Sequence, residues 1–196
     1  MPDVELPNAE ELEEIRGKAF TRMVALTTAI YAVILAITAL GGNNAMKEML
    51  LAQQQASDQW AFYQAKVIRE HQYRIARLRL EVELAEREAS MAPEARQKYA
   101  ALLAQAAEEE RRYNTEKKDI EVEAKKLERE RDINREKDPY FDFAEVLLQI
   151  AIVLASIAIL STSRPIFLLS LVLAICGTLL SINGYTLLVR LPFFSG

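Results

Sequence analysis

The sequence contains very few of the residues from which catalytic and metal-binding sites are usually built. Its 196 residues include one histidine, His71, and one cysteine, Cys176, and the cysteine lies inside a long apolar run. It has no zinc-type spacing, Gly-rich phosphate loop, nucleophile elbow or grouping of Ser, His and Asp. These absences predict a protein that is not an enzyme and that holds no metal or cofactor.

The chain also lacks an excess of positive charge. The segment 43–138 carries 19 Lys or Arg and 20 Asp or Glu, so it builds no positive field that would attract a nucleic acid. Several of these charges form pairs with Glu four residues before a base, which stabilise an exposed helix by about 0.2–0.5 kcal/mol each. The charges therefore indicate solvated helix surfaces, and nucleic acid is not expected as a partner.

Three long runs lack Asp, Glu, Lys, Arg and His altogether, namely 23–40, 146–160 and 166–189. A helix that crosses the hydrocarbon core of a bilayer needs about 20 mainly apolar residues. The first two runs reach this length when flanking aromatic residues are included, and the third is long enough alone. We therefore expect an all-α integral membrane protein with three transmembrane helices. A cleaved secretory signal is the alternative for the first run.

The charged segment between the first two runs contains neither Pro nor Gly over 46–89 or over 94–137. The residues Ser90 to Pro93 between these stretches have the composition of a turn. This pattern predicts two long helical arms that form an antiparallel, coiled-coil-like hairpin. The glycines and asparagines at 41–44 are expected to end the first membrane helix, and Pro139 to end the second arm. The expected organisation is an N-terminal tail with a short amphipathic helix at 1–19, transmembrane helices at 20–42, 139–162 and 163–189, the hairpin at 43–138, and a C-terminal tail at 190–196.

Apolar residues recur every seven positions along both arms, as they do in coiled coils. Folding the chain about the turn places Val82 near Leu102 and His71 near Tyr113. We expect His71 to be a seam residue bonded to a tyrosine or water, and a pH sensor is the alternative. The predicted seam consists of Ile68, His71, Ile75, Leu78, Val82, Leu102, Ala106, Tyr113 and Ile120.

Small residues recur on one face of each apolar run. In lipid, where no hydrophobic force drives helices together, such faces allow close approach of neighbouring helices. The runs carry no charged relay of the kind that pumps and transporters use. The residues expected to pack the membrane helices together are Ala25, Ala29, Ala32, Ala36, Ala151, Ala155, Ser170, Ala174, Gly177 and Ser181.

A second apolar stripe, rich in aromatics, runs along the first arm close to the membrane. Its members Ala56, Trp60, Tyr63 and Val67 lie at helical spacing, and the seam residues point elsewhere. Because a hairpin has only one internal partner, we predict that this stripe, with its neighbours Gln64 and Lys66, binds another copy of the protein. Packing of the tryptophan against the second arm or a lipid headgroup is the alternative.

The run ASDQWAFYQAK at 56–66, which follows Gly41-Gly42-Asn43 and an alanine-rich helix, resembles the bacterial membrane proteins grouped as domain of unknown function 4337. The resemblance implies three membrane helices around a charged helical insertion, and it transfers no catalytic residue. It also implies that Trp60, Tyr63, Gln64 and Lys66 act as a unit.

The expected function is that of a membrane-anchored structural or scaffold protein that self-assembles through its hairpin and membrane helices. An oligomeric channel, or an accessory subunit of a transport complex with a different membrane protein as partner, is the alternative. We expect a multi-pass protein of the bacterial inner membrane. Arg16, Lys18 and Arg22 before the first helix favour a cytoplasmic N terminus and a periplasmic hairpin, whereas the bases before the second helix favour the reverse.

Overall fold

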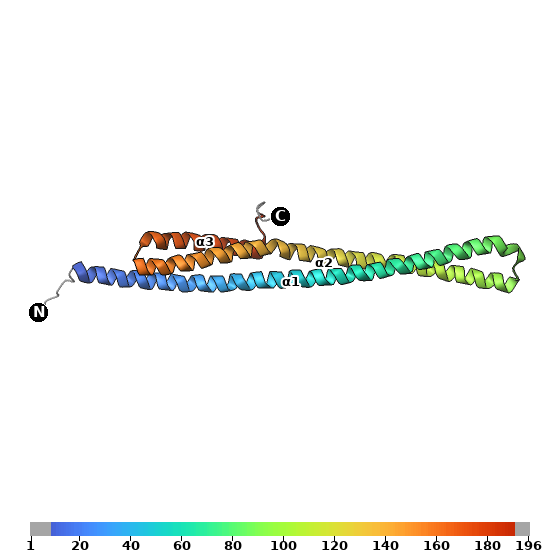
Figure 1. Cartoon of the computed structure of the whole chain (residues 1–196), viewed down its shortest axis with the longest axis horizontal. Helices are drawn as coiled ribbons and strands as arrows, with labels where there is room; N and C mark the ends of the chain where they lie inside the picture. Colours follow the sequence, from blue (N-terminus) through green and yellow to red (C-terminus); the bar gives the residue numbers. More distant parts are fainter. Residues whose placement is uncertain (1–8, 191–196) are drawn as a thin grey trace. The chain divides into compact units, whose positions relative to one another are not determined.

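The computed structural model of the chain describes residues 9–190, with side chains from residue 17 onward except that of residue 88. The described residues form α1 (Ala9–Arg87), a short 3₁₀ helix η1 (Glu88–Ser90), α2 (Pro93–Ser161) and α3 (Arg164–Thr186), and no strand lies among them (Figure 1). Each of the three α-helices contains a stretch long and apolar enough to cross a membrane. The prediction of an all-α chain with three such helices is therefore confirmed.

The helices contribute to two compact units. Among the described residues, those up to Glu48 and those from Ile133 onward form the first, called here the apolar unit. Residues 49–132 form the second, called here the charged unit. Both units draw on α1 and α2, and only the apolar unit contains α3, which returns beside the last part of α2 (Figure 1).

The core of the apolar unit is built from a few large side chains set against small ones. Val24 and Tyr31 of α1 pack against Leu148 of α2 and Phe167 of α3. Phe20 meets Phe167 edge to face, with ring centroids 5.9 Å apart. Alanines fill other positions of this core, and such small side chains allow neighbouring helices to approach closely. The remaining buried members of this core are Ala151, Ala155, Ala158 and Ala174.

The alanines of the first membrane segment are placed differently from the prediction. Ala25, Ala29, Ala32 and Ala36 are exposed, and the face of α1 that packs in the core carries Val24, Tyr31 and Thr38 at intervals of seven residues. The physical reason is the shape of the partner surface. The small residues of α2 and α3 leave room for larger side chains from α1. The other predicted packing residues, Ala151, Ala155, Ser170, Ala174, Gly177 and Ser181, are buried in the apolar unit.

Gly41 and Gly42 lie inside α1 and do not end it, contrary to the expectation of a break at 41–44. A Cβ atom on Gly41 would lie 2.5 Å from the Tyr185 Oη and 2.7 Å from Phe141 Cε1. These rings themselves meet edge to face at 4.9 Å. The two glycines therefore provide space for aromatic side chains from α2 and α3, a use of glycine that the sequence alone does not distinguish from a helix stop.

Pro139 likewise lies within α2, so the predicted end of the second arm at Asp138-Pro139 is not observed. Proline inside a helix removes one backbone hydrogen bond and usually kinks or breaks the helix. Here the next two residues, Tyr140 and Phe141, are buried. Their packing against the rest of the apolar unit offsets the lost bond.

The turns at the ends of α2 are short. α1 ends at Arg87 and α2 begins at Pro93, and proline is well suited to the first turn of a helix. The connection from α2 to α3 consists of Thr162 and Ser163, with Thr162 in the left-handed region at φ 49°. Connections of this length are common between neighbouring helices of a bundle.

Candidate functional site

In the charged unit, the segment of α1 that carries the only tryptophan packs against α2. The Trp60 Nε1 donates a hydrogen bond of 2.9 Å to a carboxylate oxygen of Glu128. One turn and a half farther along, Lys66 pairs with Glu116 at 2.5 Å. Trp60 and Tyr63 also meet edge to face with their centroids 5.4 Å apart. The aromatic stripe is thus held by polar groups of α2.

Tyr113 of α2 lies at the centre of the next contact. Its side chain is buried, and its ring stacks on that of Tyr73 at 5.7 Å. Arg69 and Arg112 donate hydrogen bonds of 3.3 Å and 3.1 Å to its hydroxyl, and the Lys66 ammonium lies 5.2 Å from the ring centroid. The two guanidinium donors, Arg69 first and Arg112 second, hold the pKa of the Tyr113 hydroxyl below its ordinary value.

A network of ion pairs continues along the same face of α1. Glu70 is only 2% exposed and is paired with Arg74 at 3.1 Å and with Lys117 of α2. Glu110 of α2 accepts hydrogen bonds from Arg74 at 2.9 Å and from Arg77 at 2.8 Å. These bonds, with Arg74 the larger cause, lower the pKa of Glu110. A buried carboxylate is stable only when it is paired in this way.

These contacts show how α1 and α2 are arranged inside the charged unit. As the residue number rises on α1 it falls on α2: Trp60 bonds Glu128, Lys66 bonds Glu116, and Arg77 bonds Glu110. Near the turn, the Tyr99 hydroxyl donates to Glu83 at 3.0 Å. The bonded residues thus follow opposite orders along the two helices, and each of these bonds joins a charged or aromatic side chain of α1 to one of α2.

The structure places the predicted oligomer-interface residues within this packing and not on a free face. Ala56 is buried, and Trp60, Tyr63, Lys66 and Val67 are half-buried toward α2. Of the predicted set, only Gln64 is exposed. The physical reason is chemical matching, since α2 presents carboxylates and a tyrosine that satisfy the indole N–H and the ammonium group, which a purely apolar seam would leave without partners.

The residues predicted to form the seam between the two arms lie mostly on an exposed face of α1. Ile68, Ile75, Leu78 and Val82 are exposed by 58%, 51%, 47% and 56%. On α2, Leu102 is exposed, Ala106 and Tyr113 are buried, and Ile120 is half-buried. His71 is exposed, and among the described residues no hydrogen bond joins it to Tyr113 as the predicted seam required. The two apolar stripes of α1 have exchanged places relative to the prediction.

The exposed stripe, called here the heptad face, consists of Ile68, Ile75, Leu78 and Val82 and continues toward the ends through Ala61 and Ala89. Part of it forms an open groove of about 380 Å³, lined by Ile75, Leu78 and Val82 with the flanking Arg79 and Glu83. Apolar side chains at this spacing suit a helical partner. The heptad face is the candidate functional site of the charged unit.

Sequence reasoning missed the residues of α2 and α1 that hold the charged unit together, chiefly Glu70, Tyr73, Glu110 and Glu128. One signal was available: Trp60, Tyr63, Val67, Glu70 and Arg77 recur at intervals of three, four and seven, so aromatic and charged residues share one helix face. Apolar periodicity alone cannot detect such a face.

Within the described residues, no group of three or more His, Cys, Asp or Glu could hold a metal ion.

Comparison with known proteins identifies one family. Its model, described as "Domain of unknown function (DUF4337)", matches residues 20–187, which include all three apolar stretches and the whole charged unit. No curated protein and no solved structure matches the chain.

Proposed function

Because the chain belongs to the DUF4337 family, whose description assigns no activity, we propose its function from the exposed faces: a non-enzymatic, membrane-anchored structural protein that self-assembles. The heptad face of the charged unit carries the proposal. A soluble helix surface does not usually present four large apolar side chains in a regular row. Such a row favours a protein partner.

The energetic case follows from the exposed area. Full burial of a Val, Leu or Ile side chain contributes about 1.5–3 kcal/mol, so burying the exposed half contributes roughly 1 kcal/mol for each of these residues. Several such contributions from each copy are needed to offset the entropy lost on association. When two copies join their heptad faces, the four apolar side chains of each copy are buried.

A second copy of the chain is the partner that best fits the geometry. All copies enter the bilayer with the same orientation, so an assembly axis normal to the membrane aligns them in parallel. Residues at one level of the heptad face then meet their equivalents, and Ile75 packs against Ile75. Polar Gln64 and His71, which interrupt the apolar row, fix the register in the way that polar core residues do in coiled coils.

The exposed alanine face of α1 supports the same proposal at membrane depth. Ala25, Ala29, Ala32 and Ala36 remain uncovered by the described part of the chain. Small residues at intervals of three and four permit close contact between helices of two copies in lipid. We therefore assign these alanines to contacts between copies.

The distribution of basic residues favours one orientation in the bacterial inner membrane. Lys18 and Arg22 precede the first apolar stretch, and the connection from α2 to α3 is followed at once by Arg164. Bases in short loops are retained in the cytoplasm, whereas segments longer than about 60 residues have little influence. We propose a cytoplasmic N terminus and a periplasmic charged unit that pairs α1 and α2 as a hairpin stalk.

The mass of the full-length protein in detergent, measured by light scattering and corrected for bound detergent, tests the proposal. We expect an oligomer for the native chain and a smaller species for Ile75→Glu, which places like charges in contact. Ala76→Glu is the matched control, because Ala76 is exposed on a neighbouring face and the added charge is the same. Equal masses for the native chain and Ile75→Glu would contradict the proposal.

Crosslinking supplies an independent measurement. In a Cys176→Ser background, Ile75→Cys is expected to form a disulfide between copies under mild oxidation in membranes, and Ala76→Cys is expected to form much less. Equal crosslinking at both positions would indicate random collision and would exclude the heptad face as the interface.

A further inference from the structure

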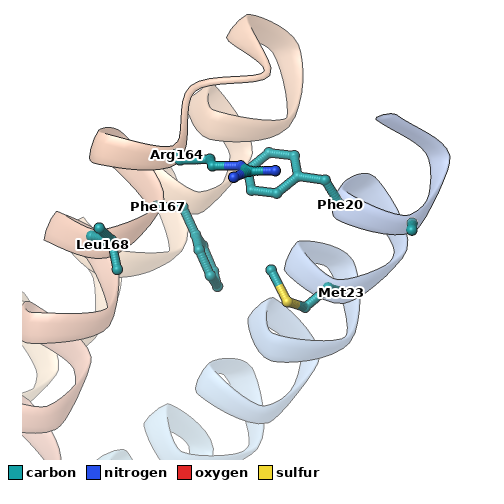
Figure 2. A pocket seen from close by; sticks show the side chains of 6 residues that line it. Phe20, Met23, Arg164, Phe167 and Leu168 are labelled. Carbon is teal, nitrogen blue, oxygen red and sulfur yellow. The ribbon is translucent and has the colours of Figure 1, made fainter. Parts of the chain in front are cut away.

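At one end of the apolar unit, α1 and α3 diverge and leave a groove. Its volume is about 520 Å³, and its lining consists of Ala19, Phe20, Met23, Arg164, Phe167 and Leu168. Figure 2 shows Phe20 and Met23 on α1 opposite Phe167 on α3, with Leu168 beside Phe167 and the Arg164 side chain extending toward the Phe20 ring. The groove combines apolar walls with a single cation.

The groove lies where the apolar stretches begin. The run without charged residues starts at Met23 on α1 and at Pro165 on α3, and Lys18, Arg22 and Arg164 lie just outside it. Leu168 is one helical turn beyond Arg164, and Met23 is one turn beyond Ala19, so the apolar lining extends about 5 Å deeper than the cation. This depth corresponds to the boundary between lipid headgroups and acyl chains.

Arg164 has no hydrogen bond or ion pair with the other described residues, and its side chain is exposed. A guanidinium group binds a phosphate through two parallel hydrogen bonds, which makes arginine well suited to phosphate recognition. A ligand with a negative charge next to a long apolar chain matches both parts of the groove.

We infer that this groove binds an anionic phospholipid. One acyl chain lies along Met23, Phe167 and Leu168, and the phosphate pairs with the Arg164 guanidinium. Lipid is the solvent that surrounds an apolar helix at this depth, so an acyl chain reaches the groove without a separate delivery step. The site prefers anionic lipids over zwitterionic lipids, because a basic pocket between membrane helices attracts a headgroup with a net negative charge.

The test uses native mass spectrometry of the full-length protein, first delipidated in detergent and then titrated with dioleoylphosphatidylglycerol or dioleoylphosphatidylcholine. We expect one tightly bound phosphatidylglycerol per chain and weaker binding of phosphatidylcholine. Arg164→Gln is expected to weaken phosphatidylglycerol binding about tenfold and to remove the preference. Lys47→Gln is the matched control, because this exposed cation belongs to the apolar unit and does not line the groove.

A second variant tests the apolar half of the site. Ala19→Trp fills the groove while Arg164 is retained, and it is expected to abolish the tight binding of phosphatidylglycerol. Undiminished binding in either Arg164→Gln or Ala19→Trp would overturn the inference, as would equal affinity for the two lipids. Displacement of phosphatidylglycerol by millimolar inorganic phosphate would also overturn it, since the site would then recognise phosphate alone. Lipids are counted per chain, so the result does not depend on self-assembly.

Discussion

The apolar unit and the charged unit both expose large hydrophobic side chains, but the expected surroundings of these side chains differ between the two units. Leu26, Ile30 and Val33 of the apolar unit are exposed by 61%, 58% and 60%, and lipid is the expected neighbour of such residues. In the charged unit, Ile68 and Val82 are exposed to a similar degree among Lys, Arg and Glu. Water is the expected neighbour of such a surface, so the hydrophobic effect favours its burial by a partner, whereas association in lipid depends on close packing of small residues.

The two units also differ in what holds their helices together. In the apolar unit, glycine, alanine and serine let the helices approach, and Thr38 and Ser181 share a buried hydrogen bond of 2.8 Å. In the charged unit, Glu70 and Tyr113 are buried with cationic partners from both helices. Packing geometry therefore dominates the first unit, and electrostatic matching dominates the second. The following changes test that contrast, beginning with the largest expected effect.

Filling the glycine contact should damage the apolar unit most. Gly41→Leu places atoms where the rings of Phe141 and Tyr185 already lie, with a Cβ contact of 2.5 Å. We expect a loss of about 3 kcal/mol in the free energy of unfolding, because overpacking costs 1–3 kcal/mol or more. Unfolding in mixed micelles, followed by circular dichroism, measures this change. Gly17→Leu is the control, since no atom lies within 4 Å of its added Cβ, and a small gain in helix stability is expected there. Equal effects at both glycines would contradict a packing role.

Removing the buried carboxylate should have the largest effect in the charged unit. Glu70→Ala leaves Lys117 and Arg74 without their shared partner, and we expect a loss of about 2 kcal/mol, below the range for a fully buried pair because the cations are partly exposed. Urea unfolding monitored by the fluorescence of Trp60, the only tryptophan, reports on this unit. Glu123→Ala removes the pair with Lys126, whose side chains are 48% and 63% exposed, and should change little. A similar loss in both variants would show that burial of Glu70 is not the cause.

The tryptophan is expected to act within one chain. Trp60→Phe keeps an aromatic ring but loses the 2.9 Å hydrogen bond to Glu128, so we expect a loss of about 1 kcal/mol in unfolding free energy measured by circular dichroism. The mass of the assembly should be unchanged. A smaller oligomer with unchanged chain stability would instead place Trp60 at an interface between copies.

The smallest effect at neutral pH concerns Glu110. The pKa of this carboxyl is lowered in the folded chain from its ordinary value of 4.5, mainly by its bond to Arg74 and then by that to Arg77. A lowered folded-state pKa contributes stability that is complete above the unfolded-state value and is lost as the pH falls through the folded-state value. The charged unit should therefore weaken below about pH 4.5, as measured by urea unfolding across pH. Glu110→Gln should reduce that acid dependence, and an unchanged slope would contradict the assignment.

Much of the architecture follows from local patterns. Runs without charge predict three apolar helices, and the composition of 90–93 predicts a turn where the structure ends α1 at Arg87 and starts α2 at Pro93. The roles of Gly41 and Pro139 could not be deduced in this way. Each residue commonly ends a helix. The side chains that pack beside Gly41, those of Phe141 and Tyr185, are far from it in the sequence.

The sequence pattern was also insufficient to predict which face of α1 contacts α2. The heptad spacing of Ile68, Ile75 and Val82 predicted the face of α1 that meets the second arm, but these side chains are exposed, and spacing alone does not say which face α2 covers. By itself, the sequence determined which segments are helical and which helices are apolar enough to cross a membrane, because these properties depend on residues close together along the chain. Only the tertiary structure decided which stripe faces α2, because that depends on whether Trp60, Lys66 and Glu70 find complementary groups on a helix more than forty residues away.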